Sequence, residues 1–342
     1  MLKGDNTIRG VSSCYNLKIH IIVIGYKKKG ESIVVVFEDT EKPIEERAVY
    51  SVVIDSFFDG KGKKKLNITD EYLRKFKIGR TLSMLVWTHP HLDHSKGIKH
   101  ILSKYTSEKT KVISSPHFFN RKDDIISVTG KENIDAVKEI FESFRFKHGI
   151  IGRPSVMEGA SEPLDMITFS GMDGTRMNVS LDAIAPITSI IDGYKYDGKS
   201  GLNPNEVSIS FILNVDDCYF LFAGDTLDNH FLRVNQMNLK NCRFIKIPHH
   251  ASRTSSSLIG FLDDDIVETA CVTRFKSGNS DLPNQDVING YLGLTPNVFS
   301  TGDGAHEKER YGIIEYEYIL HKDEPFEINV NLYGNAYLCK AE

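Results

Sequence analysis

The sequence predicts one large α/β domain over residues 1–342, and three observations support this prediction. The chain is 40% hydrophobic and 26% charged, which is an ordinary globular balance, and 342 residues can bury a substantial core without disulfides. Apolar runs of strand length occur from end to end, and segments of helical spacing lie between them. No internal repeat or low-complexity tract divides the chain, so we interpret residues 105–200 as an elaboration within the same domain.

The first sixty residues are expected to form β structure. Residues 17–24 and 32–37 are apolar runs separated by Gly25 and Gly30, a pattern typical of a hairpin. Residues 49–55 form a third apolar run, which ends in the turn-rich sequence FFDGKGK. A short helix is expected next, with Thr69 as its N-cap.

The middle of the chain mixes all three kinds of structure. Residues 82–87 are predicted to be a short buried strand. In residues 132–146 the apolar side chains recur at helical spacing, and residues 193–205 (GYKYDGKSGLNPN) have the composition of a mobile loop. Further strands are expected at residues 207–215, 219–223 and 243–247, followed by a final hairpin at residues 312–320 and 326–333.

Charge and cysteine content narrow the functional classes. Five widely spaced cysteines without a CxxC pair indicate reduced thiols and argue against a cysteine-based zinc site. The net charge of −4 provides no general attraction for nucleic acid, and we interpret the lysine runs at residues 27–29 and 61–65 as solvated loop ends. Because the sequence has neither a long apolar run nor an apolar signal-peptide core, we expect a cytoplasmic protein without membrane association.

A cluster of metal-binding residue types follows the strand predicted at residues 82–87. The sequence THPHLDHSKG places His89, His91, Asp93 and His94 within six residues. In an extended segment, residues two apart point to the same side, so His89 and His91 can bind one ion. A turn then directs Asp93 and His94 toward a second ion. Imidazole and carboxylate ligands suit zinc, and also manganese or iron.

Two later segments offer further ligands, each at the end of a predicted strand. Asp225 follows the apolar strand of FLFAGDT, and His249 and His250 follow the strand of RFIKIPHHAS. Two ions about 3.5–4 Å apart can activate water at neutral pH and clamp the oxygens of a displacement reaction. The sequence therefore predicts a binuclear metal site assembled from three segments.

These motifs, in this order, resemble those of the metallo-β-lactamase superfamily, and in detail the hydrolase domain of the ComEC-type competence proteins and its soluble relatives. The resemblance covers most of the chain and rests on the segments KIHIIVIGYKKKGESIVVVF, VVIDSFFDG, THPHLDHSKG, LDAIAPITS, NEVSISFIL, FLFAGDT, IKIPHHAS and TRFKSGNSDLP. It implies a four-layer αββα sandwich with the metals at one edge of its two sheets.

The resemblance also implies a role for each ligand of two divalent ions, either Zn²⁺ or Mn²⁺. His89 and His91 would bind the first ion, and Asp93, His94 and one residue of the His249/His250 pair would bind the second. Asp225 would bridge the two ions, and Asp55 would orient a ligand from behind. We favour His250 as the ligand and His249 as a group that contacts substrate.

The sequence departs from the family at three places. The third histidine expected for the first ion is missing, and Asn205 and Ser208 stand in that region; His117 or His148 could supply the nitrogen. The glycine that usually follows the histidine pair is Ala251, and the histidine before the late proline is Leu282. The first ion is therefore expected to be held weakly or to be completed by water.

The resemblance favours a metal-dependent hydrolase that cleaves phosphodiesters, with nucleic acid as the favoured substrate and with Asp93 and His249 as catalytic residues. The candidates for substrate contact are Asn205, Ser208, Arg253, Thr254, Ser255, Lys276 and Ser277. Two alternatives remain open: hydrolysis of a small ester or cyclic nucleotide, and a metal-binding interaction module without catalysis.

Overall fold

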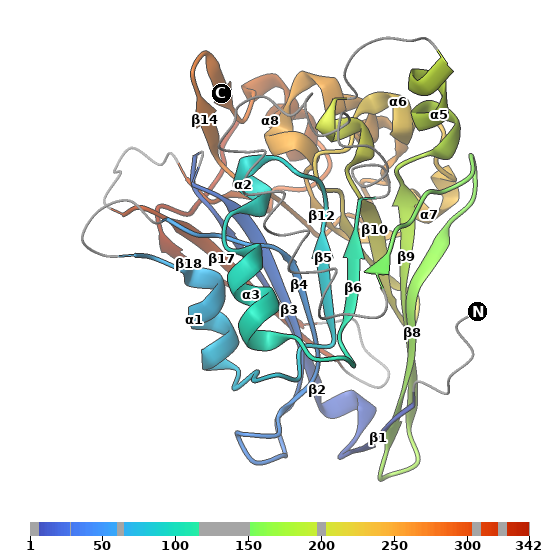
Figure 1. The fold of residues 1–342 in the computed structure, drawn as a ribbon, viewed down its shortest axis with the longest axis vertical. Coiled ribbons are helices and arrows are strands. Elements are labelled where there is room, and N and C mark those ends of the chain that lie inside the picture. Colours follow the sequence, from blue (N-terminus) through green and yellow to red (C-terminus); the bar gives the residue numbers. More distant parts are fainter. Residues whose placement is uncertain are drawn as a thin grey trace.

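The computed structural model describes residues 7–27, 29–59, 65–115, 151–196, 203–302, 309–320 and 327–341. The helix expected at residues 132–146, His117, His148 and most of the lysine run at residues 61–65 lie outside the described residues. The described chain is a mixed α/β protein with two large sheets and several short helices (Figure 1).

The first sheet has eight strands and contains the N-terminal hairpin. In spatial order its strands are β18 (Glu327–Gly334), β17 (Gly312–Ile319), β2 (Leu17–Gly25), β3 (Glu31–Asp39), β4 (Ala48–Asp55), β5 (Met84–Trp87), β6 (Lys111–Ser114) and β7 (Ile151–Gly152). Strands β18 to β4 pair antiparallel, and β4 to β7 pair parallel. The change of direction at β4 places the carboxyl ends of β4 and β5 at the same edge.

The second sheet has nine strands and is also mixed. In spatial order they are β1 (Thr7–Val11), β8 (Glu162–Gly171), β9 (Arg176–Ala185), β10 (Ser210–Val215), β11 (Cys218–Phe222), β12 (Cys242–Lys246), β13 (Thr269–Val272), β16 (Val298–Ser300) and β19 (Tyr337–Leu338). Strands β11, β12, β13 and β16 run parallel, so their carboxyl ends also share one edge.

The two sheets share one apolar core, as the alternation of side chains along β2 shows. Ile21 and Val23 belong to a fully buried cluster that also contains Phe211 of β10 and Phe222 of β11 in the other sheet. Because successive side chains of a strand point to opposite faces, the intervening Ile22 belongs to a separate cluster on the outer face. Burial of apolar surface between the two sheets is thus the main contribution to stability.

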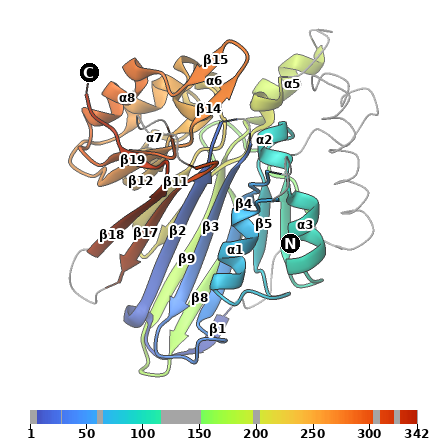
Figure 2. The ribbon, with the colours of Figure 1, turned by 90° about the vertical axis from the view of Figure 1, so that its left-hand side faces the viewer.

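Helices cover the outer faces of the sheets. The outer cluster of the first sheet includes Leu73 of α1 (Ile68–Lys75) and Ile101 of α3 (Ile98–Tyr105), and both views show these helices against β2 to β5 (Figures 1 and 2). Tyr291 of α8 (Gln285–Leu292) and Leu258 of η5 (Arg253–Phe261) pack onto the second sheet. The other short helices are η1 (Cys14–Asn16), α2 (Leu92–Ser95), α5 (Thr188–Tyr196), η3 (Pro204–Val207), α6 (Asp228–Phe231), α7 (Gln236–Lys240) and η4 (Pro248–Ala251), and β14 (Phe275–Ser277) pairs with β15 (Ser280–Leu282).

Most expected elements are present, and three expectations need correction. All the strands and the final hairpin named above are found, with ends within three residues of those expected. The N-cap of α1 is Asn67, which accepts a hydrogen bond from the amide of Asp70 at 3.0 Å, whereas Thr69 lies inside the helix. The predicted loop at residues 193–205 begins as helix α5, which extends to Tyr196, and residues 197–202 lie outside the described chain.

The third correction concerns β8 and β9, a long hairpin that we did not expect. Its second strand alternates strictly, with Met177, Val179 and Leu181 buried and their neighbours more exposed. Among the described residues, no helix combines the length and apolar character needed to cross a membrane. All five cysteines are buried and free.

Candidate metal centre

The first group of candidate ligands lies at the carboxyl end of β5. The strand ends at Trp87, and the chain then turns so that His91 becomes the N-cap of the one-turn helix α2. Asp93 and His94 lie within this helix and are buried, as is His89. The short helix therefore holds two adjacent ligands in fixed directions, whereas His91 is only half-buried.

Asp225 approaches from the second sheet, immediately after β11. It follows Gly224, whose φ of +50° lies in the left-handed region. A Cβ at Gly224 would lie 2.6 Å from the Ser208 hydroxyl and 2.9 Å from the carbonyl of Ile209, so only glycine fits this turn. The amide of Asp225 donates a hydrogen bond to the Ser208 hydroxyl at 2.9 Å, which fixes the backbone of the turn.

The histidine pair follows β12 within the short helix η4. His249, His250 and Ala251 all have positive φ values, of 46°, 53° and 59°. Three successive non-glycine residues in this region are strained, and such strain is concentrated at functional sites. The tight turn separates the two rings, whose centroids are 6.5 Å apart.

The three segments converge on one carboxylate oxygen. The Oδ2 atom of Asp225 lies 3.7 Å from Nε2 of His89, 3.5 Å from Nε2 of His94 and 3.6 Å from Nε2 of His250. The cluster extends to Oδ2 of Asp93, which is 3.4 Å from Nε2 of His250 and 3.7 Å from Nε2 of His94. His91 joins through its Nδ1, 3.0 Å from Nε2 of His89. Residues distant in sequence thus place nitrogen and oxygen atoms around a common centre.

Hydrogen bonds behind the rings decide which nitrogens face this centre. Asp55 lies 2.7 Å from Nδ1 of His94 and accepts the Thr88 hydroxyl at 2.7 Å. Because that hydroxyl has only one proton, its oxygen accepts from Nδ1 of His89 at 3.0 Å. Asp55 therefore orients His94 directly and His89 through Thr88, and both rings direct Nε2 inward.

The donor set fits a metal ion. Nε2 of His94, Nε2 of His250 and Oδ1 of Asp225 are shielded from solvent and have no hydrogen-bond partner among the described residues. Burying such atoms unsatisfied is costly, and bound metal ions would satisfy them. His89, His94 and Asp225 place one ligand atom each within 4.8 Å of one another, and so do Glu31, His94 and His250. The buried clusters could thus hold a metal ion.

No protein-family model and no curated protein matches this chain.

The electrostatics of the cluster favour a cation at its centre. Burial alone would lower the pKa of His94, but the carboxylates of Asp225, Asp55 and Asp93 outweigh it and raise that pKa well above the usual value. Burial would likewise raise the pKa of Asp225, but His250 and His94 lower it well below the usual value. Burial lowers the pKa of His89. A carboxylate-rich position that attracts a proton also attracts a divalent ion, whose binding displaces that proton.

His249 lies beside the cluster, and both of its ring nitrogens contact residues outside it. Its Nε2 is 3.0 Å from Nδ2 of Asn205, and its Nδ1 is 3.0 Å from the Thr254 hydroxyl. Oδ1 of Asn205 is buried and has no partner among the described residues. Ser208 lies 3.4 Å from Nδ1 of His89, behind that ring rather than at its metal-facing side. Asn205 therefore contacts His249, and Ser208 supports Asp225 and His89.

The remaining substrate-contact candidates are less closely tied to the cluster. Arg253 is exposed and forms an ion pair with Asp286, and Lys276 forms an ion pair with Asp281 at 2.9 Å. Ser277 is exposed in the β14–β15 hairpin. That hairpin does begin at the site, because its first residue stacks on His250: the Phe275 ring centroid is 4.9 Å from that of the imidazole. The structure brings neither Arg253 nor Lys276 to the cluster. Ser255 is buried, and its hydroxyl donates a hydrogen bond to the carbonyl of Thr226.

Four residues around the cluster were not anticipated from the sequence. Thr88 and Thr273 contact ligand histidines, and Glu31 forms a fully buried ion pair with Lys246 at 2.9 Å. Burial would raise the pKa of Glu31, but Lys246 and two nearby histidines outweigh it, so the carboxyl remains charged. The sequence did contain a signal for the ion pair. Glu31 in GESIVVVF and Lys246 in RFIKIPHH are charged residues beside apolar runs, and a charged residue is rarely buried without a partner.

If the cluster binds two ions, as the sequence predicts, we expect the two positions to differ in affinity. One position has His89, His91 and a share of Asp225, whereas the other has Asp93, His94 and His250 in addition to Asp225. Dialysis against a weak chelator should therefore leave about one ion per chain while activity falls. Elemental analysis checks this, and two equally tight ions would indicate an additional ligand such as His117.

Proposed function

We propose that this protein is a metal-dependent hydrolase of the metallo-β-lactamase superfamily that cleaves phosphodiester bonds, with nucleic acid as the favoured substrate. The proposal is carried by one observation: three imidazole nitrogens surround the Asp225 carboxylate at the edge shared by two sheets. The motif order in the sequence supports the same family.

The arrangement of elements supports the finer fold assignment, a four-layer αββα sandwich. One apolar core lies between the sheets, and α1 and α3 cover the first sheet while α8 and η5 cover the second. The carboxyl ends of β5, β11 and β12 deliver the ligands to one edge. A sandwich of this kind would present its site where the two sheets meet (Figure 2).

We further propose that the cluster binds two divalent ions, Zn²⁺ or Mn²⁺. His89 and His91 would hold one, Asp93, His94 and His250 would hold the other, and Asp225 would contact both. Bound ions would lower the pKa of water and stabilise negative charge on phosphate oxygens. The protein fixes the ligands beforehand, because Asp55 and Thr88 hold the rings of His94 and His89.

Two residues suit the remaining steps: Asp93 within the cluster and His249 beside it. The Asp93 carboxylate is held in its charged form by His94 and His250 against the effect of burial, so it can accept a hydrogen bond from the attacking water. His249 is half-buried, and burial lowers its pKa, so its ring is neutral near pH 7. Asn205 and Thr254 contact the two nitrogens of this ring and fix its position beside the cluster.

One observation favours a second candidate function, hydrolysis of a small ester or cyclic nucleotide. Arg253 and Lys276, the two cations expected from the sequence to contact substrate, are already paired with Asp286 and Asp281. A polymer backbone is usually held by several unpaired cations, whereas a small substrate needs few. The net charge of −4 points in the same direction.

The metal-loaded protein should be assayed side by side on linear DNA, RNA, cyclic dinucleotides and a generic phosphodiester. The proposal predicts turnover of the generic phosphodiester that a strong chelator abolishes and that added Zn²⁺ or Mn²⁺ restores. Cleavage of DNA or RNA would support a nuclease, and cleavage of cyclic dinucleotides alone would support the second candidate. Tight metal binding without turnover of any of these would indicate an interaction module.

A further inference from the structure

Two fully buried charges lie behind His250, where neither contacts solvent. Glu31 begins β3 in the first sheet and Lys246 ends β12 in the second, and their side chains are 4% and 0% exposed. Their Oε1 and Nζ atoms are 2.9 Å apart, so this ion pair joins the two sheets. A buried ion pair is often no more stabilising than apolar residues of the same size, because both charges lose their hydration. Its presence beside the cluster therefore calls for a reason other than stability.

The second oxygen of Glu31 leads directly to a candidate ligand. The Thr273 hydroxyl donates a hydrogen bond to Oε2 of Glu31, and Nδ1 of His250 lies 2.9 Å from that hydroxyl oxygen. Because the single hydroxyl proton is donated to Glu31, the Thr273 hydroxyl oxygen accepts from Nδ1–H of His250, which also lies 3.2 Å from the Thr273 carbonyl oxygen. Nε2 of His250 is then the nitrogen that faces Asp93 and Asp225.

We propose that Glu31 is a positioning residue of the metal centre, which fixes the tautomer and orientation of His250 through Thr273 and is itself held by Lys246. The inference rests on the proposed metal centre and names a residue that supports it. A matching arrangement lies on the other side, where Asp55 orients His89 through the Thr88 hydroxyl. The first sheet thus contributes both carboxylates, and each sheet contributes one threonine that links a carboxylate to a histidine at the shared edge.

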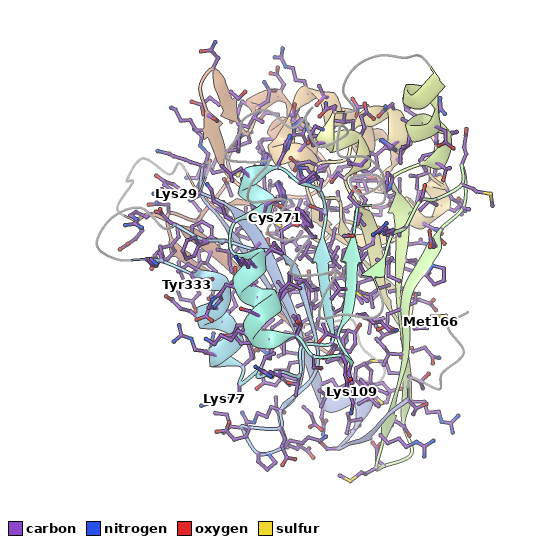
Figure 3. The ribbon with its side chains drawn as sticks, viewed as in Figure 1. Lys29, Lys77, Lys109, Met166, Cys271 and Tyr333 are labelled. Carbon is purple, nitrogen blue, oxygen red and sulfur yellow. The ribbon has the colours of Figure 1, made fainter. Side chains whose placement is uncertain are left out.

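The backbone before Glu31 turns from the surface into the interior, which brings the Glu31 side chain to Thr273 and Lys246. Lys29 lies at the surface, whereas Cys271, which precedes Thr273 by two residues, lies in the interior (Figure 3). Between Lys29 and Glu31, Gly30 has a φ of +146°, and a Cβ there would lie 3.2 Å from the carbonyl oxygen of Asp93. The hairpin tip is therefore packed directly against the metal-binding loop, and glycine lets the chain bring Glu31 inward within two residues.

The test uses Glu31→Gln, Thr273→Val and Thr273→Ser, with Asp165→Asn as the matched control. Asp165 is also a buried carboxylate that joins the two sheets, through an ion pair with Lys111 and a hydrogen bond from Tyr50 at 2.8 Å. It lies near the opposite end of the strands, because Lys111 begins β6, whereas the ligands follow the end of β5. Loss of this carboxylate should therefore affect stability without affecting the metal centre.

Dissociation constants for Zn²⁺ and the visible absorption of bound Co²⁺ are measured for each variant, with circular dichroism as the check on folding. Glu31→Gln and Thr273→Val should each weaken the binding of one ion by about 10- to 100-fold and alter the Co²⁺ spectrum. Thr273→Ser, which keeps the hydroxyl, should retain wild-type binding and spectrum, as should Asp165→Asn. If Glu31→Gln fails to fold, the comparison of Thr273→Val with Thr273→Ser decides.

Wild-type metal affinity and spectrum in folded Glu31→Gln and Thr273→Val would overturn the role of Glu31 while leaving the metal centre intact. A wild-type protein that binds neither Zn²⁺ nor Co²⁺ would overturn the metal centre and the positioning role together. Neither readout depends on phosphodiester turnover, so failure of the proposed activity is seen separately.

Discussion

Replacing Asp93 with asparagine should reduce the metal-dependent turnover of a phosphodiester by roughly 10³-fold or more while the fold survives. The change removes one negative charge and preserves side-chain volume. Asp93 lies 3.4 Å from Nε2 of His250 and 3.7 Å from Nε2 of His94, so its carboxylate supplies charge to the side that holds both histidines. An amide oxygen binds a divalent ion less strongly than a carboxylate and cannot take up a proton from water.

The measurement is kcat/KM together with metal content, and His94→Ala should show a loss of similar size. Asp70→Asn is a suitable control, because Asp70 is also buried and multiply hydrogen-bonded but lies in α1, where it contacts Lys104, Tyr105 and His100. The control should keep full metal content and turnover even if its melting temperature falls. Full activity in Asp93→Asn protein with intact metal content would falsify the proposed mechanism.

The parts of the fold that could be predicted are those in which a local pattern coincides with burial. Strands β2 and β3 are continuous apolar runs because both of their faces are covered, and such runs are visible in the sequence. The hairpin of β8 and β9 was missed because its region is rich in polar residues. Two signals were nevertheless visible in the sequence. Gly174 marks the turn, where its φ is +83°, and the apolar residues Met177, Val179 and Leu181, which are buried, stand at every second position.

Helix α5 shows why composition misled at residues 193–205. Glycine, lysine and aspartate are common in loops, but Ile190 and Ile191 at the start of the helix are buried, and tertiary burial outweighs weak local preference. The N-cap of α1 differs for a related reason. The hydroxyl of Thr69 already accepts a hydrogen bond from the amide of Phe57 in the preceding loop, which leaves capping to Asn67.

The candidate ligands could be identified from the sequence because each lies in a short motif directly after the end of a strand. Of the residues behind them, Asp55 was expected from the resemblance, but Glu31 and Lys246 were not, because their contact joins positions more than two hundred residues apart. No local spacing encodes such a pair; only the stacking of the two sheets brings it together. The same holds for Asn205 and His249, which meet through η3 and η4.

The histidine pair should separate metal binding from catalysis. His250→Ala should lose one ion and activity together, because Nε2 of His250 lies within 3.4 Å of Asp93 and 3.6 Å of Asp225. His249→Ala should keep both ions and lose about 10²–10⁴-fold in kcat, as expected for a group that contacts substrate or the leaving oxygen. Alanine itself is compatible with the turn, because Ala251 adopts the same left-handed conformation at a φ of 59°.

The decisive data are the metal content and kcat of the two alanine variants, with Thr254→Val as a further comparison. Thr254 contacts only the far nitrogen of His249, so its loss should lower kcat modestly and leave both ions in place. Loss of an ion from His249→Ala, with His250→Ala unaffected, would reverse the ligand assignment. If both alanine variants kept two ions and full rate, the turn at η4 would have no part in the site, and its three left-handed residues would need another explanation.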